Sequence, residues 1–160
     1  AIINGNRYYF LTGYNYNIQM EDDQAGIMCT GYRVIDRKLY YFDKDGGCCG
    51  VCGPKNGWYD VNGIRYYMIE GKVASGMLNI NGVDYAFARD GKMYANEIVS
   101  TDIINKICYA NADGSIVTTR GWHLTSYGYI FVQQGGEVCT GIHTIDGVTY
   151  MFGSDGILMY

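Results

Sequence analysis

The sequence has 160 residues, of which 23 are Gly, 17 are Tyr and one is Pro, and its formal net charge is −4. The acidic balance argues against a nucleic-acid partner, which a basic surface normally binds, and no apolar run reaches the roughly 18 residues of a membrane span. Aromatic and β-branched residues interrupted by Gly favour short strands over helices. We therefore expect an all-β chain that binds no nucleic acid and does not insert into a membrane.

A pattern of roughly 20 residues recurs along the chain, as in repeat architectures. Each copy has a Gly, a strand, Asn-Gly or Asp-Gly, a second strand and a further Gly, as in GWYDVNGIRYYMIEG from Gly57 to Gly71. We read residues 1–160 as a single repeat module with insertions at 12–23 and 47–56. Its units start near residues 2, 31, 57, 76, 99, 121 and 141.

The Asn-Gly and Asp-Gly pairs predict the geometry of each unit. They are the preferred residues for a two-residue type I′ turn, in which both central residues have positive φ. An isolated hairpin is marginally stable in water, whereas stacked hairpins bury a continuous core. The sequence therefore predicts a β-solenoid of about seven stacked β-hairpin repeats of roughly 20 residues each.

A two-residue turn also fixes which side chains share a face of the third hairpin. Directly opposed residues lie on the same face, so Trp58 and Tyr67 are expected beside Asp60 and Arg65. The other face is more apolar and is predicted to be the core. Its members and their equivalents in later units are Tyr59, Val61, Ile64, Tyr66, Met68, Ile80, Val83, Tyr85, Phe87, Ile145, Val148, Tyr150 and Phe152.

The outer face differs from unit to unit, as expected of a surface that binds a ligand. The sixth unit is interpreted as one residue shorter before its Tyr129 than the other units. The outer-face residues predicted in the second, fourth and sixth units are Tyr32, Val34, Leu39, Tyr41, Met77, Asn79, Asp84, Ala86, Trp122, Leu124 and Ile130.

The pattern G-W-x-x-x-N-G-x-x-Y-Y-M at Gly57 to Met68 resembles the cell-wall-binding repeats of Gram-positive surface proteins, which include choline-binding and glucan-binding modules. The phrase TGIHTIDGVTYMFGSDG, from Thr140 to Gly156, is similar to the combined repeats of clostridial large toxins. The resemblance covers nearly the whole chain apart from the two insertions. It implies a solenoid of hairpins that serves as a non-catalytic attachment module, secreted or on the cell surface, and binds choline or carbohydrate.

In choline-binding repeats the ligand is held by the Trp after Gly, a second Trp just before Tyr-Tyr, and a neighbouring aromatic. A quaternary ammonium needs several electron-rich faces around it. Here the second Trp is absent, and a cationic Arg65 would repel choline. In the units with a normal register that position holds Arg7, Leu39, Arg65, Asp84, Ile107 and Thr149.

A sugar site is therefore favoured, with choline as the alternative. Flat aromatics beside polar groups suit sugar hydroxyls, and the candidate ligands are cell-wall polysaccharide, teichoic acid or host glycan. The structural alternatives are that the aromatics pack between repeats, that Asp60 and Arg65 form only a cross-strand ion pair, and that the module is a stalk or protein-adhesion unit. The predicted ligand-binding residues are Trp58, Asp60, Arg65 and Tyr67, then Tyr32 with Tyr41, then Trp122.

Three cysteines lie in the second insertion, Cys48, Cys49 and Cys52. The Cys-x-x-Cys spacing is typical of metal or redox motifs, but tetrahedral zinc needs four ligands. We therefore expect no metal and no cofactor. Local disulfides and free thiols are left open.

Other reactive side chains fit structural roles. Cys29 and Cys139 occupy the same repeat position five units apart, so we do not expect them to pair, and Cys108 replaces a core Tyr as a buried thiol. His123 and His143 occupy equivalent strand positions. No G-x-S-x-G, H-E-x-x-H or phosphate loop is present, so we do not expect an enzyme, although sequence does not exclude a carboxylate pair.

Two further segments allow more than one interpretation. The first insertion carries Tyr14, Tyr16 and the acidic run 21–23, which extend a sugar site, bind a cation or form solvated surface. The apolar end Ile157–Tyr160 suggests either continuation of a parent chain or a homodimer through the solenoid ends. The chain begins at Ala1 without Met and is read as a mature or excised fragment, so the missing signal peptide says nothing about secretion.

Overall fold

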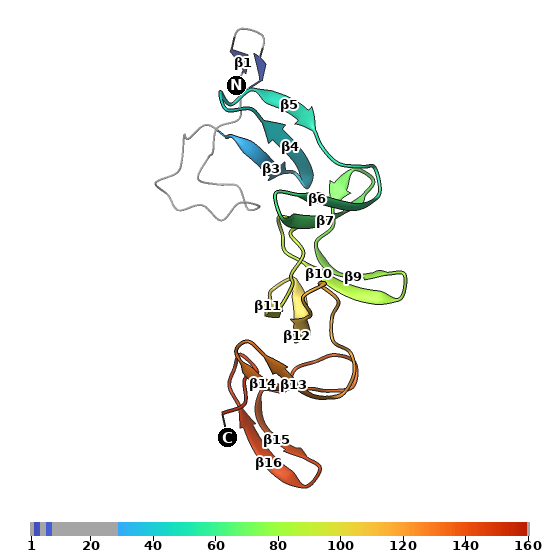
Figure 1. The fold of residues 1–160 in the computed structure, drawn as a ribbon, viewed down its shortest axis with the longest axis vertical. Helices are drawn as coiled ribbons and strands as arrows, with labels where there is room; N and C mark the ends of the chain where they lie inside the picture. Colours follow the sequence, from blue (N-terminus) through green and yellow to red (C-terminus); the bar gives the residue numbers. More distant parts are fainter. Residues whose placement is uncertain (1, 4–5, 8–28, 160) are drawn as a thin grey trace. The chain divides into compact units, whose positions relative to one another are not determined.

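The structure is a computed structural model, and it describes residues 2–3, 6–7 and 29–159. These residues form antiparallel hairpins and contain no helix, which confirms the predicted all-β class (Figure 1). Their contacts divide the chain into two compact units, Ala1–Ala74 with Arg89–Lys92, and Ser75–Ala88 with Met93–Tyr160. The solenoid and its number of repeats remain predictions, and the first insertion lies outside the described residues.

The first unit contains one small hairpin and two three-stranded sheets. The third strand of the β3–β4–β5 sheet comes from the second insertion, which was read as a lengthened connection but pairs antiparallel with β4. The strands are β1 (Ile2–Ile3) with β2 (Asn6–Arg7); β3 (Gly31–Ile35), β4 (Lys38–Phe42) and β5 (Cys48–Val51); and β6 (Gly57–Val61), β7 (Ile64–Ile69) and β8 (Lys72–Val73).

The second unit contains four two-stranded hairpins in succession. After each hairpin the chain folds back on its second strand through an isolated bridge, such as Val132 with Val138 and Phe152 with Leu158. The strands are β9 (Gly76–Ile80) with β10 (Val83–Phe87), β11 (Glu97–Thr101) with β12 (Ile104–Ala110), β13 (Gly121–Thr125) with β14 (Gly128–Val132), and β15 (Gly141–Ile145) with β16 (Val148–Phe152).

The predicted turns and register are confirmed in the third hairpin. Asn62 and Gly63 have φ values of 51° and 73°, as a type I′ turn requires. The pairs Trp58 with Tyr67 and Asp60 with Arg65 lie directly opposite each other. On the other face, Tyr66 and Met68 are buried and the remaining predicted core residues pack against them.

The core of the described residues consists of five separate clusters, of which four combine residues of two successive hairpins and one lies within the β3–β4–β5 sheet and Cys29. In β14, Ile130 and Val132 join the cluster shared with β12, whereas Phe131, between them, joins the cluster shared with β15 and β16. The β13–β14 hairpin therefore has apolar side chains buried on both of its faces. The prediction of one core face and one outer face is too simple for that reason.

Several predicted faces are corrected by this arrangement. Val34 and Leu39 were assigned to the outer face but are buried, because they pack against Tyr66 and Met68 of the following hairpin. Ala86 is buried in the same way, against β11 and β12. Conversely, two predicted core residues that directly follow a turn, Val83 and Val148, are 39% and 53% exposed.

The sixth unit is not shortened, and its register differs from the prediction. Thr125 pairs with Gly128, and Leu124 lies opposite Tyr129. The Thr125 hydroxyl accepts the Tyr127 backbone N–H and donates to the Gly128 carbonyl, which closes the turn without an Asn-Gly pair. Ile130, predicted outside, consequently takes the buried inner position, and Tyr129 points outward at 51% exposure.

Candidate functional site

The main candidate site is the outer face of the β6–β7 hairpin, formed by Trp58, Asp60, Arg65 and Tyr67. Two cross-strand pairs bring the four side chains together. The Trp58 and Tyr67 rings meet edge to face with centroids 5.0 Å apart. Trp58 is 37% exposed although it lies within a strand pair. All four residues predicted as the primary site are therefore adjacent on one face, where Trp58, Asp60 and Arg65 are exposed and Tyr67 is partly buried.

The charged half of this face is an ion pair that also touches the aromatic half. Arg65 donates from Nε and an Nη to the two Asp60 oxygens, at 2.7 and 3.0 Å. This hydrogen bonding holds the pKa of Asp60 below its usual value. The Arg65 guanidinium carbon lies 5.5 Å from the centroid of the Trp58 ring. The protein's own cation thus occupies the cation–π position of Trp58.

The two weaker sequence candidates are more involved in packing. The Tyr32 and Tyr41 rings lie 5.0 Å apart, and Tyr32 packs against the core cluster of β4 and β7, whereas Tyr41 is partly exposed. Trp122 contacts Phe131 within its hairpin. It also meets Tyr150 and Phe152 of the next hairpin, with ring centroids 4.8 and 5.8 Å away. The inter-repeat contacts of Trp122 match the packing alternative.

The two most exposed of the large aromatic side chains in the described range were not predicted as site residues. Tyr127 and Tyr129 are 61% and 51% exposed, and Leu124, opposite Tyr129, is 67% exposed. Tyr129 occupies the place that Arg65 has in β7, because each is the second residue of its strand and pairs four positions into the preceding one. This unit has no Asn-Gly pair at its turn, and that difference in the sequence indicated that its register could not be taken from the other units.

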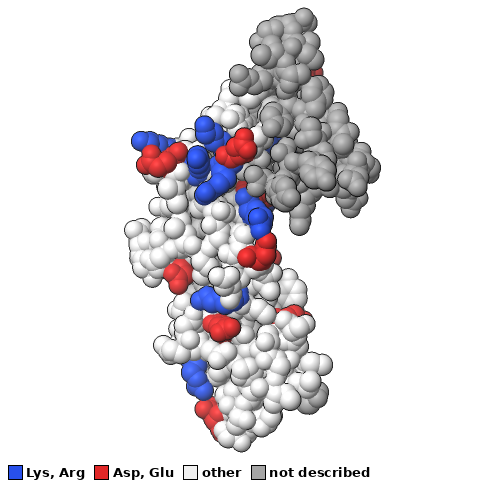
Figure 2. Space-filling model, turned by 180° about the vertical axis from the view of Figure 1, so that it is seen from behind, with Lys and Arg blue, Asp and Glu red and all other residues white. Residues whose placement is uncertain are grey.

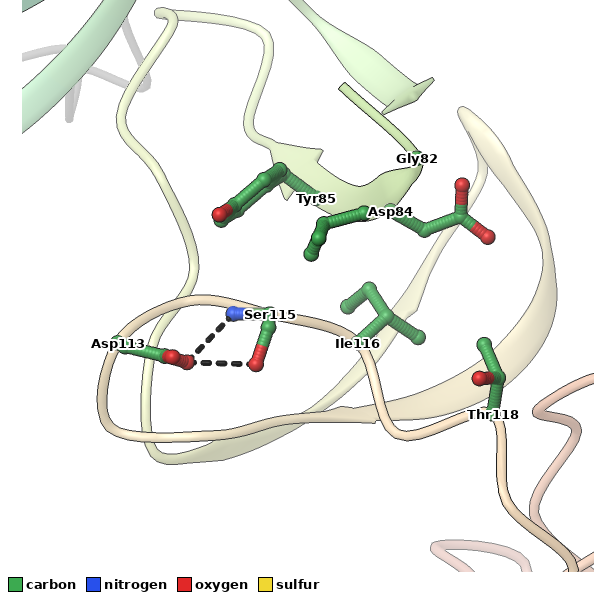
Figure 3. A pocket seen from close by; sticks show the side chains of 8 residues that line it. Gly82, Asp84, Tyr85, Asp113, Ser115, Ile116 and Thr118 are labelled. Atoms are coloured by element: carbon green, nitrogen blue, oxygen red, sulfur yellow. Dashed lines mark hydrogen bonds between the residues drawn. The ribbon is translucent and has the colours of Figure 1, made fainter. Parts of the chain in front are cut away.

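A hollow of about 430 Å³ in the second unit was not predicted from the sequence either. Its walls are residues 82–85, at the start of β10, and the loop at 113–118, which folds back so that Ser115 bridges to Tyr85 (Figure 3). The Ile116 backbone N–H donates to the Asp84 carbonyl at 2.8 Å and fixes the loop against the strand. Two carboxylates, Asp84 and Asp113, line the hollow.

All six cysteines are free thiols. Cys108 is fully buried as predicted, and burial raises its pKa to about 11. Within the described ranges no group of three or more His, Cys, Asp or Glu side chains is placed to hold a metal ion. His123 and His143 each have Nε2 near a Thr backbone carbonyl, at 3.3 and 2.9 Å, so both rings contact the backbone.

The surface charges are interspersed. On the face drawn in Figure 2, Lys and Arg side chains lie next to Asp and Glu instead of forming a patch of one sign. Exposed ion pairs such as Lys55 with Glu70 and Arg120 with Asp146 contribute to this pattern. Along residues 2–3, 6–7 and 29–159, no helix has the length and hydropathy of a membrane-crossing segment.

Comparison with known proteins gives relatives from streptococci. The chain is 28% identical over 145 residues to Glucosyltransferase-S of Streptococcus downei, across 84% of this chain and 10% of that protein. It is also 28% identical over 154 residues to Glucosyltransferase-S of Streptococcus mutans serotype c, with the same coverage. The chain thus spans about a tenth of the length of these relatives. No family model matches it.

Solved structures give the same picture for the fold. Choline binding protein F of Streptococcus pneumoniae, crystallised with a peptidoglycan analogue, superposes with a TM-score of 0.53 at 25% identity, across 99% of this chain and 50% of that one. CbpJ of Streptococcus pneumoniae TIGR4 has a TM-score of 0.54 at 24% identity, across 99% of this chain and 51% of that one. These similarities confirm the resemblance to choline-binding and glucan-binding repeat proteins of Gram-positive bacteria.

Proposed function

We propose that this chain is a non-catalytic, cell-surface attachment module that binds carbohydrate through the outer face of the β6–β7 hairpin. The observation that carries the proposal is the position of the exposed Trp58–Tyr67 pair beside the Asp60–Arg65 ion pair. An aromatic ring covers the apolar face of a sugar, and the ion pair offers donors and acceptors to its hydroxyls. The ligand class is cell-wall polysaccharide, teichoic acid or host glycan.

The similar proteins support this assignment. The streptococcal relatives are named glucosyltransferases, and the structure of choline binding protein F was determined with a peptidoglycan analogue. Because the chain matches about a tenth of the glucosyltransferases, we assign it binding and not their reaction. The same relatives support a surface location on a Gram-positive bacterium.

Replacement of Trp58 by Ala is expected to weaken glycan binding at least tenfold, since exposed Trp side chains dominate binding sites of this kind. Isothermal titration against the strongest hit of a glycan array measures the effect. Val51→Ala, an exposed apolar truncation in the same unit, is the control and is expected to bind normally. Both variants should unfold in urea with nearly the wild-type midpoint.

An array of neutral glycans, host glycans and bacterial wall polymers that gives no binding contradicts the proposal. Unchanged affinity of a folded Trp58→Ala variant also contradicts it. Stable, soluble protein that binds no sugar but retains a protein partner would identify the stalk or adhesion alternative.

One observation favours choline as a second candidate ligand, at a different hairpin. In β13–β14, Trp122 follows the first Gly and Tyr129 lies where choline-binding repeats carry their second Trp. The stretch Gly121–Val132 contains no Asp, Glu, Lys or Arg. The neighbouring Arg120 guanidinium lies over the Phe131 ring, 4.9 Å from its centroid, and not over Trp122 or Tyr129. Exposed Tyr129 and partly exposed Trp122 offer electron-rich edges and faces to a quaternary ammonium.

Retention on a choline-affinity column tests this candidate. If β13–β14 binds choline, the wild-type chain is retained and Tyr129→Ala elutes early, because removal of one aromatic face weakens a cation–π site by about 1 kcal/mol or more. Tyr127→Ala, the exposed neighbour in the turn, is the matched control and is expected to be retained. A wild-type chain that passes through the column excludes this candidate and leaves the sugar proposal intact.

A further inference from the structure

The hollow in the second unit combines groups suited to a sugar with a distinct electrostatic preference. It is lined by Gly82, Val83, Asp84, Tyr85, Asp113, Ser115, Ile116 and Thr118. Its volume of about 430 Å³ falls within the range of roughly 300–1,000 Å³ that small-molecule sites occupy. Figure 3 shows the Ile116 side chain between the two carboxylates, with the Tyr85 ring on the side of Asp113 and the Asp84 side chain pointing the other way. The lining therefore has an acidic group at each end and apolar groups between them and beside Asp113.

In each of the two carboxylates, one oxygen accepts hydrogen bonds within the protein and the other is left for a ligand. Asp84 Oδ1 accepts a hydrogen bond from Asn79 Nδ2 at 2.7 Å. Asp113 Oδ1 accepts from the Ser115 backbone N–H at 2.9 Å and from its hydroxyl at 2.6 Å (Figure 3). Among the described residues, no hydrogen bond or ion pair reaches Oδ2 of either side chain. Two carboxylate oxygens are thus oriented by the fold and available to donors.

The charge of the lining determines which chemical groups of a ligand the hollow can bind. The hydrogen bonds from Ser115 lower the pKa of Asp113, so its carboxylate is ionised at neutral pH. The lining contains no Lys, Arg or His. A ligand that carries carboxylate, sulfate or phosphate would meet uncompensated negative charge. Hydroxyl and protonated amine groups would instead form charge-assisted hydrogen bonds.

We propose that this hollow is a second sugar-binding site, which accepts neutral or amino-bearing sugar units and rejects anionic ones. Ile116 contacts the apolar face of the sugar, Asp84 accepts hydroxyl or amine protons at one end of the hollow, and Asp113, with Tyr85 beside it, accepts them at the other. This inference rests on the proposed function and adds a selectivity that the Trp58 face, with its balanced Asp60–Arg65 pair, does not have. Neutral glucan and deacetylated hexosamine units are accepted, and phosphate-rich teichoic acid is excluded from this site.

Amide NMR titration of the full chain tests the inference with isomaltotriose, glucosamine trimer and glucuronic acid as probes. The first two are expected to shift the Ile116 and Thr118 signals, and glucuronic acid is not. Asp113→Asn keeps the turn acceptor but removes the charge, and is expected to weaken glucosamine-trimer binding at the hollow about tenfold. The matched control is Asp155→Asn, because Asp155 Oδ1 accepts the Ile157 N–H in the same turn position of the last hairpin.

The outcomes separate the two proposals. If the amide signal of Trp58 shifts while those of Ile116 and Thr118 do not, the hollow is not a binding site and the proposed function still stands. Equal weakening by Asp113→Asn and Asp155→Asn would also overturn it, because the effect would then come from the turn. Equal response to glucuronic acid would overturn the selectivity. The absence of any shift with any probe would overturn the hollow, and the glycan array then decides the proposed function separately.

Discussion

Phe152→Ala is expected to lower the free energy of unfolding by about 3–5 kcal/mol, the usual cost of truncating a buried Phe. Phe152 is 2% exposed and lies in the last core cluster, with Phe131, Cys139 and Ile145. It also stacks on Trp122 of the preceding hairpin at 5.8 Å. Removal of the ring therefore leaves a cavity between two hairpins, where neither backbone can collapse to fill it.

Val148→Ala is the matched control in the same strand, and a change within about 0.5 kcal/mol is expected. Both positions were predicted to be core, but Val148 is 53% exposed. Urea denaturation followed by circular dichroism gives the midpoint and slope for each variant. Phe152→Leu, a milder truncation, provides a measurable value if the Ala variant does not fold. Similar destabilisation by Val148→Ala and Phe152→Ala would contradict the observed burial.

The difference between these two residues shows what the sequence predicts well. Turn chemistry is local: Asn62 and Gly63 set positive φ, the turn sets the register, and the register places Trp58 beside Tyr67. Burial is not local, because it depends on which neighbouring hairpin covers a given position. Strand alternation predicts that Val148 and Phe152 share a face, but it does not reveal that only Phe152 is covered.

The sixth hairpin shows the same limit at the level of register. Its turn is closed by the Thr125 hydroxyl instead of an Asn-Gly pair. Tyr129 was therefore assigned to the core position of this unit, although Ile130 occupies that position. The consequence is functional, since the correct register gives this hairpin an outward Tyr129 and makes choline a specific second candidate.

The hollow was not predictable because its two walls are far apart in the sequence. Asp84 was predicted as an outer-face residue, whereas Asp113 was not singled out. The loop folds back onto the strand through the hydrogen bond from the Ile116 N–H to the Asp84 carbonyl, and this places Asp84 and Asp113 in the same hollow. The primary site differs in this respect, because all four of its residues lie in one hairpin whose register the sequence determines.

Gly156→Ala is expected to destabilise the chain by about 3 kcal/mol, and Gly147→Ala by only about 1 kcal/mol. Both glycines have a φ of +84°, so an L-residue at either position incurs the left-handed penalty of about 1–2 kcal/mol. They differ in surroundings: nothing lies within 4 Å of a Cβ added at Gly147, whereas one added at Gly156 would overlap the Cγ1 methyl of Val138.

Val138 cannot yield to that Cβ, because it is 2% exposed and packs with Ile130 and Val132 in the cluster that joins β12 to β14. Overpacking of such a core typically costs a further 1–3 kcal/mol, roughly. The difference between the two variants in urea denaturation thus measures the close approach of hairpins alone, with backbone strain cancelled. Equal destabilisation would show that the glycines that end each repeat are needed only for their turns. A larger loss at Gly156 would show that this glycine also allows the last two hairpins to approach each other at the distance that Val138 sets.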